Sequence, residues 1–290
     1  MSDKGVDANR MHEANRKRWD IASPHYKVQR DDGWRRCLAD PSLGFERGAL
    51  QLLRQYMGNG LLGKTACVLG SGDNYAAFAL AGMGTQVTSV DISQAQLDVA
   101  AERAAELGVD VAFVQGDVTN LPMLAGGVFD LVCSTNGVMV WITEPAAYYA
   151  EAHRILKPGG IFLSHDIHPF QRPWSAPPES LRMLKPYFDS GPKEWLDTPE
   201  TCEAVLASES SPEERQGRVP TFKCHWTVSE LLMAMLDAGL ELVHILEEPD
   251  TNPGFWLSGA TDEDADLIDW QKNPRAGLPV WLTLVATKRG

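Results

Sequence analysis

Polar residues follow two predicted strands at positions suited to holding a nucleotide-like ligand. Gly70-Ser71-Gly72 comes directly after the apolar run 66–69 and opens into a predicted helix. Glycine lets the backbone turn sharply and approach a ligand, and the free N–H groups of a helix N-terminus favour anions. Asp91 ends the next strand, close to the spacing of about 20 residues expected of an acid that binds ribose hydroxyls. Together these positions predict a nucleotide site.

A third acid, Asp117, follows the third predicted strand in the pair Gly116-Asp117. Both of its oxygens accept hydrogen bonds, so it could accept one from an exocyclic adenine amine. The alternative is a loop aspartate that caps the following turn.

A parallel sheet covered by helices would place these residues at one edge. Short apolar runs alternate with longer amphipathic segments between residues 63 and 167, which predicts a βαβαβαβ arrangement. The predicted strands are 66–69, 86–90, 111–115, 131–134 and 161–165, and the predicted helices are 75–82, 93–107 and 146–156. Lys157-Pro158-Gly159-Gly160 is expected to end the last helix and turn the chain.

The rest of the chain divides into a lid, a cap and the end of the core. Residues 169–220 hold nine of the 18 prolines and few long apolar periods, which indicates an inserted cap. Regular patterns resume with a helix at 228–238 and strands at 241–246 and 280–286. We therefore predict an N-terminal helical lid segment (1–61), a core (62–168 and 221–290) and a Pro-rich substrate cap (169–220).

Five segments, in order, resemble class I S-adenosylmethionine-dependent methyltransferases of the kind found in ubiquinone and menaquinone biosynthesis. They are VLGSGDN, TSVDIS, FVQGDVTNLP, FDLVCSTNGV and AHRILKPGGIFL, all within residues 62–168. The resemblance implies a Rossmann-like α/β fold, with a seven-stranded, mostly parallel sheet and helices on both faces. It also implies S-adenosylmethionine as cofactor and in-line methyl transfer to a small-molecule acceptor.

The resemblance also assigns cofactor-binding roles to individual residues. Gly70 and Gly72 would lie against the methionine part, and Ser71 between them is also counted as cofactor-binding. Asp91 would bind the ribose, and Ile92 would pack on the adenine. Further members of the implied site are Asp117 and Val118 at the adenine edge, Ser134 beside the cofactor, and Tyr26, which would close over it from a W-x(6)-Y lid helix.

Two departures from the family pattern concern the methionine end of the cofactor. Val68 stands where the family usually has an acid, and Asn74 stands where it often has a third glycine. Asp73 or Asn74 is expected to supply polar contacts there instead.

The acceptor side offers histidines and aromatic residues. His168 could act as a base toward the acceptor, and His165 or Asp166 could orient it. Both histidines, like Asp166, lie at the carboxyl end of the strand 161–165, where such sheets bind ligands. The alternative for each is a hydrogen-bonded structural histidine. His225 is a weaker candidate. Eight of the nine tryptophans lie outside residues 62–168, which suits either an enclosed apolar pocket or ordinary packing of the cap.

Two other functions share this core. An NAD(P)-dependent oxidoreductase would need glycine at the third position of G-x-G-x-x-G, where this chain has Tyr75, so it is disfavoured. An S-adenosylmethionine-binding protein without transferase activity is the second alternative, motivated by the altered glycine motif.

The composition of the 290-residue chain argues against several classes of partner. Its 26 Lys and Arg against 39 Asp and Glu give a net charge of -13, the wrong sign for neutralising phosphates, so no nucleic-acid substrate is expected. The chain has no long apolar run and no secretory leader, which predicts a cytoplasmic protein without membrane contact. The five scattered cysteines suggest neither disulfides nor a metal site. A homodimer is also considered.

Overall fold

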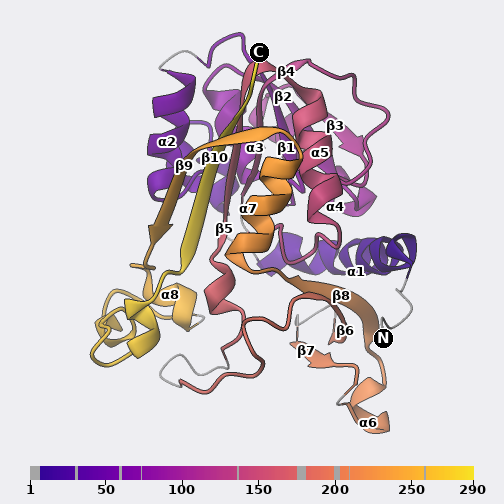
Figure 1. Ribbon diagram of the computed structural model, residues 1–290, viewed down its shortest axis with the longest axis vertical. Helices are drawn as coiled ribbons and strands as arrows, with labels where there is room; N and C mark the ends of the chain where they lie inside the picture. The colour runs from indigo at the N-terminus through magenta and orange to yellow at the C-terminus, as the bar shows by residue number, and fades with distance from the viewer. Residues whose placement is uncertain are drawn as a thin grey trace.

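The computed structural model has two β-sheets with a long helix lying between them (Figure 1). It describes residues 7–29, 32–58, 61–72, 74–135, 137–174, 181–198, 203–208, 210–257 and 259–290, with the side chains of 25–29, 203–204 and 214 left out. The helices are α1 (Ala8–Gln29), α2 (Gly48–Met57), α3 (Tyr75–Gly82), α4 (Gln94–Leu107), α5 (Pro145–Ile155), α6 (Pro212–Arg215), α7 (Val228–Asp237) and α8 (Pro253–Trp256).

The larger sheet has seven strands in the order β3-β2-β1-β4-β5-β10-β9. β1 pairs in parallel with β2 and β4, β2 with β3 and β4 with β5, whereas β10 runs antiparallel to both β5 and β9. The predicted seven-stranded, mostly parallel sheet is therefore confirmed. Its strands are β1 (Thr65–Leu69), β2 (Gln86–Asp91), β3 (Val111–Gln115), β4 (Phe129–Thr135), β5 (Leu156–Ile167), β9 (Leu240–Glu248) and β10 (Trp281–Lys288).

Helices cover both faces of this sheet. The side chains of β1 alternate between these two faces, which explains why its residues are apolar throughout. Successive side chains of a strand point to opposite faces. Ala66 and Val68 pack in the cluster that includes α2 and α3, while Cys67 and Leu69 pack in the cluster that includes α5 and α7. A strand buried on both faces must be continuously apolar, as this one is.

The segment Lys157-Pro158-Gly159-Gly160 lies inside β5 and does not precede it. Phe129 pairs with Leu156 and Leu131 pairs with Ile161, so the extra residues form a bulge between two paired positions. Gly159 adopts a φ of +75°, which glycine tolerates without steric cost. The predicted strand 161–165 is therefore only the regular part of a longer strand.

The smaller sheet is antiparallel, in the order β7-β6-β8. Its strands are β6 (Gly191–Thr198), β7 (Glu203–Leu206) and β8 (Val219–His225), so β8 crosses position 220, where the cap is predicted to end. α1 lies against β8 on one side and against α4 on the other (Figure 1). Among the described residues, no helix is both long enough and apolar enough to cross a bilayer.

Candidate functional site

A cavity of about 170 Å³ opens where the carboxyl ends of β1, β2 and β3 meet α1. Ligands of open α/β sheets bind at this edge. Many predicted site residues lie on its wall, together with residues of α1 and of the segment after β4. The lining residues are His12, Asn15, Trp19, Ser23, Gly70, Ser71, Gly72, Asp91, Ile92, Gln96, Val99, Arg103, Asp117, Val118, Thr119, Thr135, Gly137, Val138, Trp141 and Ile142.

The glycine turn is held open to the cavity by its backbone geometry. Gly70 has a φ of +63°, and a Cβ placed on it would lie 2.9 Å from Cγ1 of Val138. Gly72, with a φ of +50°, would meet only a backbone oxygen 4.0 Å away. The turn therefore presents bare backbone to the cavity, as a closely bound ligand requires.

Asn74 supports this turn from below and does not line the cavity. It is fully buried, its φ is +66°, and its side-chain amide donates to the carbonyl of Gly72 at 2.7 Å. Ser89 Oγ donates to Asn74 Oδ1 at 2.5 Å. Asparagine tolerates the left-handed conformation, so it can stand where the family often has glycine. Its side-chain amide bonds Gly72 and Ser89, so it supports the turn and is not turned toward a ligand. Asp73, the other predicted contact, lies outside the described residues.

Asp91 is 7% exposed, and both of its oxygens point to backbone amides. Oδ2 accepts from Gly72 N and Oδ1 accepts from Ser93 N, each at 2.9 Å. Burial raises the pKa of Asp91, and these backbone hydrogen bonds act in the opposite direction. Each carboxylate oxygen has a further lone pair, so Asp91 can still accept from ribose hydroxyls. Ile92 and Val118 supply apolar wall on the same side.

Asp117 is bonded to α1 by a residue that sequence reasoning missed. Its Oδ2 pairs with Nδ1 of His12, whose Nε2 is hydrogen-bonded to Thr143 Oγ1, while its Oδ1 accepts from Thr119 N at 2.9 Å. Burial alone would lower the pKa of His12, but the hydrogen bond and charge of Asp117 raise it. Burial alone would raise the pKa of Asp117, but the hydrogen bonds from His12 and Thr119 and the charge of His12 lower it. His12 carries no sequence motif that could have identified it.

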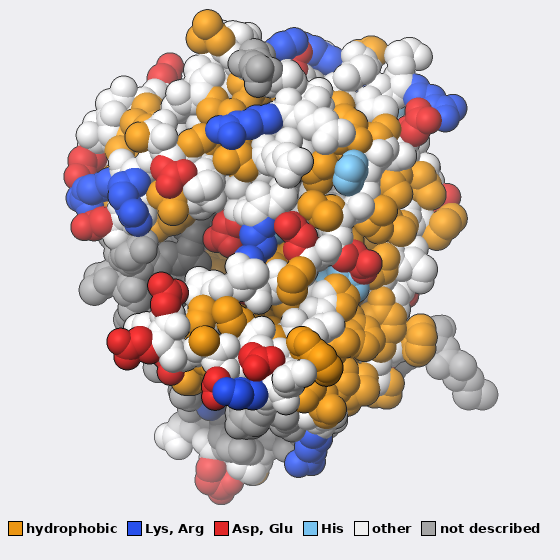
Figure 2. Space-filling view, turned by 90° about the vertical axis from the view of Figure 1, so that its left-hand side faces the viewer, with side chains coloured by type: hydrophobic (Ala, Val, Ile, Leu, Met, Phe, Trp, Pro, Cys, Tyr) orange, Lys and Arg blue, Asp and Glu red, His pale blue; other side chains and the backbone are white. Residues whose placement is uncertain are grey.

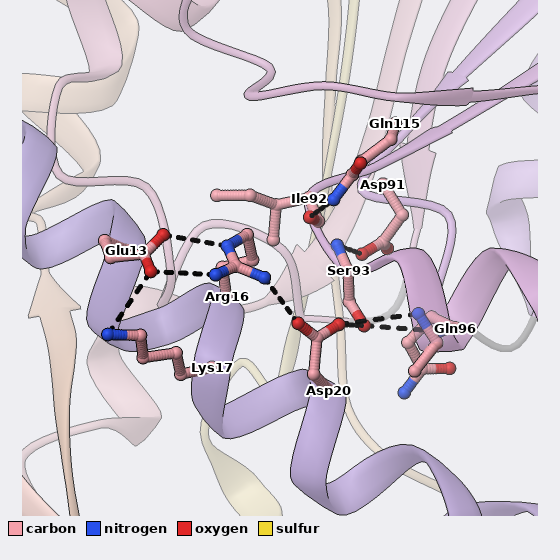
Figure 3. Close-up of polar contacts among 10 residues, drawn as sticks. Glu13, Arg16, Lys17, Asp20, Asp91, Ile92, Ser93, Gln96 and Gln115 are labelled. Atoms are coloured by element: carbon pink, nitrogen blue, oxygen red, sulfur yellow. Dashed lines mark hydrogen bonds and ion pairs between the residues drawn. The ribbon is translucent and has the colours of Figure 1, made fainter.

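A second set of contacts fastens α1 to the start of α4 (Figure 3). Asp20 accepts from Ser93 Oγ at 2.7 Å, and Arg16 extends this contact by donating to Asp20 at 2.6 Å and to Glu13 at 2.8 Å. Because Ser93 is also the N-cap of α4 and donates its N–H to Asp91, α1 is tied to the residues that form the cavity wall.

The predicted catalytic histidines lie away from the cavity. His165 is 1% exposed, bonds Thr283 Oγ1 through Nδ1 at 2.8 Å and stacks on Trp281, and burial lowers its pKa to about 4. His168 accepts from Phe170 N at 3.1 Å and contacts Glu247 through Nε2 at 2.8 Å. These contacts favour the structural alternative for both histidines.

Two more predicted residues fall outside the cavity wall. Ser134 is buried and accepts a hydrogen bond from Tyr148 at 2.9 Å, while the next residue, Thr135, lines the cavity in its place. Tyr26 belongs to α1, but its side chain lies outside the described part of the structure.

The donors and walls of this cavity suit S-adenosylmethionine. The buried carboxylate of Asp91 ends β2, and the half-buried carboxylate of Asp117 follows β3. The glycine turn leaves no room for a Cβ at Gly70, and apolar residues separate the polar groups. Among the described residues, no three His, Cys, Asp or Glu side chains are grouped so that they could hold a metal.

Comparisons with known proteins agree with this architecture. Residues 68–164 match the model of a methyltransferase domain. A ubiquinone biosynthesis O-methyltransferase from Pseudomonas paraeruginosa is 35% identical over 106 residues, which cover 36% of this chain and 45% of that relative. The chain thus spans less than half the length of this curated relative.

Solved structures share the fold at low sequence identity. Geranyl diphosphate C-methyltransferase from Streptomyces coelicolor, solved with Mg²⁺, geranyl diphosphate and S-adenosyl-L-homocysteine, has a TM-score of 0.58 and 18% identity over 98% of this chain and 100% of that one. The [4+2]-cyclase SpnF has a TM-score of 0.51 and 19% identity over 83% of this chain and 82% of its own. The Rossmann-like fold that the resemblance implies is confirmed.

Proposed function

We propose that this chain, in which residues 68–164 match a methyltransferase domain, is a class I S-adenosylmethionine-dependent methyltransferase that transfers a methyl group to a small-molecule acceptor. The observation that carries the proposal is the meeting of the glycine turn, Asp91 and Asp117 in one cavity. These residues come from three different strand ends, and only the parallel sheet brings them together.

In this proposal Asp91 holds the ribose, Asp117 holds the adenine amine, and the turn at Gly70–Gly72 holds the methionine part. When bound, S-adenosylmethionine supplies an activated methyl group on a sulfonium. The protein's own task is to position the acceptor and exclude water, which can account for about 7–11 kcal/mol of a barrier. α1 is suited to excluding water because His12, Asn15 and Trp19 cover the cavity.

We propose an oxygen nucleophile on the acceptor, in line with the name of the ubiquinone biosynthesis O-methyltransferase relative. Trp19 and Trp141 meet edge to face at 5.2 Å on the cavity wall, which suits an apolar or ring-bearing molecule. Residues 169–220 are proposed to act as the substrate cap. The net charge of -13 continues to disfavour nucleic acid.

The competing candidate is a protein that binds S-adenosylmethionine without transferring its methyl group. This chain shares its fold with a [4+2]-cyclase, so the fold by itself does not determine the reaction. That likeness supports the competing candidate.

Titration calorimetry with S-adenosylmethionine and S-adenosylhomocysteine tests the cofactor assignment. We expect a single site per chain for both ligands, and the absence of binding at millimolar ligand would contradict the proposal. Turnover is then followed as S-adenosylhomocysteine release with a panel of phenols and other hydroxyl compounds. Cofactor that binds but is never consumed across the panel would favour the competing candidate.

We also propose a cytoplasmic homodimer. β9 is an edge strand with Val243 and Ile245 exposed, and Figure 2 shows hydrophobic side chains gathered toward the right and lower parts of the face that carries β9 and α8. Light scattering at several concentrations tests the dimer, and cell fractionation tests the location. A monomer at all concentrations would contradict the first.

A further inference from the structure

A second cavity lies between the sheet and helices α5 and α7, and Met139 and Val140 of the segment that follows β4 form part of its wall. Its volume is about 30 Å³, enough for about two water molecules. The wall is apolar except for a few polar side chains, which are Tyr149, Ser164, Asp166, Arg172 and His225.

Four polar atoms of this wall are buried without a hydrogen-bond partner among the described residues. They are Tyr149 Oη, Asp166 Oδ1, Arg172 Nη2 and His225 Nδ1. Tyr149 and His225 are themselves almost fully buried, at 0% and 1% exposure. Asp166 Oδ1 and Arg172 Nη2 form an ion pair with each other, so Tyr149 Oη and His225 Nδ1 are the two atoms of this wall that have neither kind of partner among the described residues. An unsatisfied buried polar group costs about 1–3 kcal/mol, so two of them facing one cavity indicate a place that suits a polar ligand group.

The hydrogen bonding of His225 fixes which of its nitrogens carries the proton. Nε2 lies 2.6 Å from the backbone oxygen of Tyr187, and a carbonyl can only accept, so Nε2 must be the donor. In a neutral ring, Nδ1 then carries a free lone pair. Burial lowers the pKa of His225, and the nearby cations Lys185 and Arg172 lower it further, against the opposing effects of Tyr187 and Glu230. The lowered pKa of His225 favours the neutral ring, which is the form that a base needs before it acts.

This cavity adjoins the proposed cofactor cavity through one short segment. Gly137 and Val138 line the first cavity, and Met139 and Val140 line the second. Arg172 Nη2 lies 4.0 Å from the place that a Cβ on Gly137 would occupy. Arg172 therefore lies at the boundary between the two cavities, beside the segment that both of them share.

The charges around the second cavity favour a neutral group over an anion. Asp166 Oδ1 and Arg172 Nη2 are 3.7 Å apart, so their charges offset one another. A hydroxyl can donate to an acceptor without a hydrogen bond, such as His225 Nδ1, and accept from Arg172 Nη2, whereas a fully ionised carboxylate or phosphate has no proton to give.

We propose that the second cavity receives the hydroxyl end of the methyl acceptor and that His225 Nδ1 is its general base. This inference rests on the proposed methyl transfer. The acceptor oxygen forms a bond to the methyl carbon as the carbon–sulfur bond breaks, and that bond's electron pair stays on sulfur. The hydroxyl proton moves to His225 Nδ1, so the positive charge lost by the sulfonium appears on the imidazole.

The test uses the full chain with ¹⁵N-labelled histidine, S-adenosylhomocysteine and phenol as a hydroxyl probe. NMR is expected to show a proton on Nε2 and none on Nδ1 of His225 at pH 7. Phenol added to the S-adenosylhomocysteine complex should then shift the Nδ1 resonance. A protonated Nδ1, or an Nδ1 signal that saturating phenol leaves unchanged, overturns the proposal, and these wild-type spectra require no variant to fold.

Variants separate this inference from the proposed function. H225Q retains an amide donor for the Tyr187 carbonyl but has no basic Nδ1, so we expect phenol affinity to fall at least tenfold while S-adenosylhomocysteine affinity is unchanged. H244Q is the matched control, because His244 lies on β9, contacts Tyr56 of α2 and lines neither cavity. Equal phenol binding by both variants overturns the inference. Failure of S-adenosylhomocysteine to bind the wild type would instead contradict the proposed function.

Discussion

At the scale of single residues, two groups compete for one carboxylate in the proposed cofactor site. Asp117 is the proposed partner of the adenine amine, yet its Oδ2 is paired with His12 of the lid helix. A cofactor that uses Asp117 must therefore weaken or share this ion pair. The charge on His12 then links pH to cofactor affinity.

We expect the affinity for S-adenosylhomocysteine to increase with pH in a way that depends on His12. The folded-state pKa of His12 is raised above 6.5, so the stabilisation from its ion pair is complete below pH 6.5 and is lost as the pH rises through the raised value. Above that range the competing cation is gone. Calorimetry between pH 5.5 and 8.5 on wild type and His12→Gln measures the difference, and the same pH dependence in both proteins would contradict the link.

The ribose assignment predicts the effect of Asp91→Ala. Hydrogen bonds to a charged group contribute about 1.5–3 kcal/mol, so we expect S-adenosylhomocysteine to bind roughly 10- to 150-fold more weakly. Asp98→Ala, on the exposed face of α4, is the control and should bind normally. Thermal melting of both variants accompanies the calorimetry, because Asp91 also accepts from two backbone amides of the site. Unchanged affinity in Asp91→Ala would show that the ribose lies elsewhere.

The residues that the sequence could identify are those whose role is written in local spacing. Gly70, Asp91 and Asp117 each follow a strand, so the strand pattern was sufficient to place them at one edge. His12 has no such signal, because its partner Asp117 is more than 100 positions away. His225 has no such signal either, because its free Nδ1 depends on the carbonyl of Tyr187, which only the folded chain brings to it.

At the scale of elements, α1 connects the cofactor cavity to the smaller sheet. Asn15 accepts from Phe222 N at 2.7 Å and donates to Phe222 O at 2.9 Å, so its amide pairs with β8 as a neighbouring strand would. On the opposite side Asp20 holds the start of α4. The prediction of a helical lid was based on the pattern around Trp19, but the pairing with β8 needs the cap strands, which the proline-rich sequence did not reveal.

Asn15→Ala is expected to loosen the lid from the cap. Because Asn15 is 3% exposed, its loss leaves the amide and carbonyl of Phe222 without partners, at a cost of about 1–3 kcal/mol. Hydrogen exchange should report faster exchange of the Phe222 amide, and urea unfolding should report the lost stability. Lys17→Ala is the control on the same helix, since the ion pair of Lys17 with Glu13 is exposed and such pairs contribute little. Equal exchange in both variants would contradict the role of Asn15.

At the scale of the whole molecule, a buried charge cluster joins the lid to the cap. Arg18 and Asp197 are 2% and 0% exposed in their side chains, and Arg18 Nε donates to Asp197 Oδ2 at 3.1 Å. Lys223 of β8 lies 2.9 Å from the other oxygen of Asp197. Arg18 also lies over the ring of Trp19, which lines the cofactor cavity. The cap can thus affect cofactor binding without touching the cofactor, through the position of α1.

Asp197→Ala tests whether the lid and cap act as one unit. Removing one partner of a buried ion pair leaves uncompensated charge and typically costs about 3–5 kcal/mol, so we expect a large loss in the free energy of unfolding. Asp189→Ala is the matched control in the same cap, because Asp189 pairs with Lys193 at 2.8 Å but is 44% exposed, and such surface pairs contribute about 0–1 kcal/mol.

If Asp197→Ala frees only the cap, faster proteolysis of residues 181–225 should be accompanied by weaker S-adenosylhomocysteine binding, because α1 would lose its support. Faster proteolysis with unchanged affinity would instead mean that α4 alone holds the lid in place.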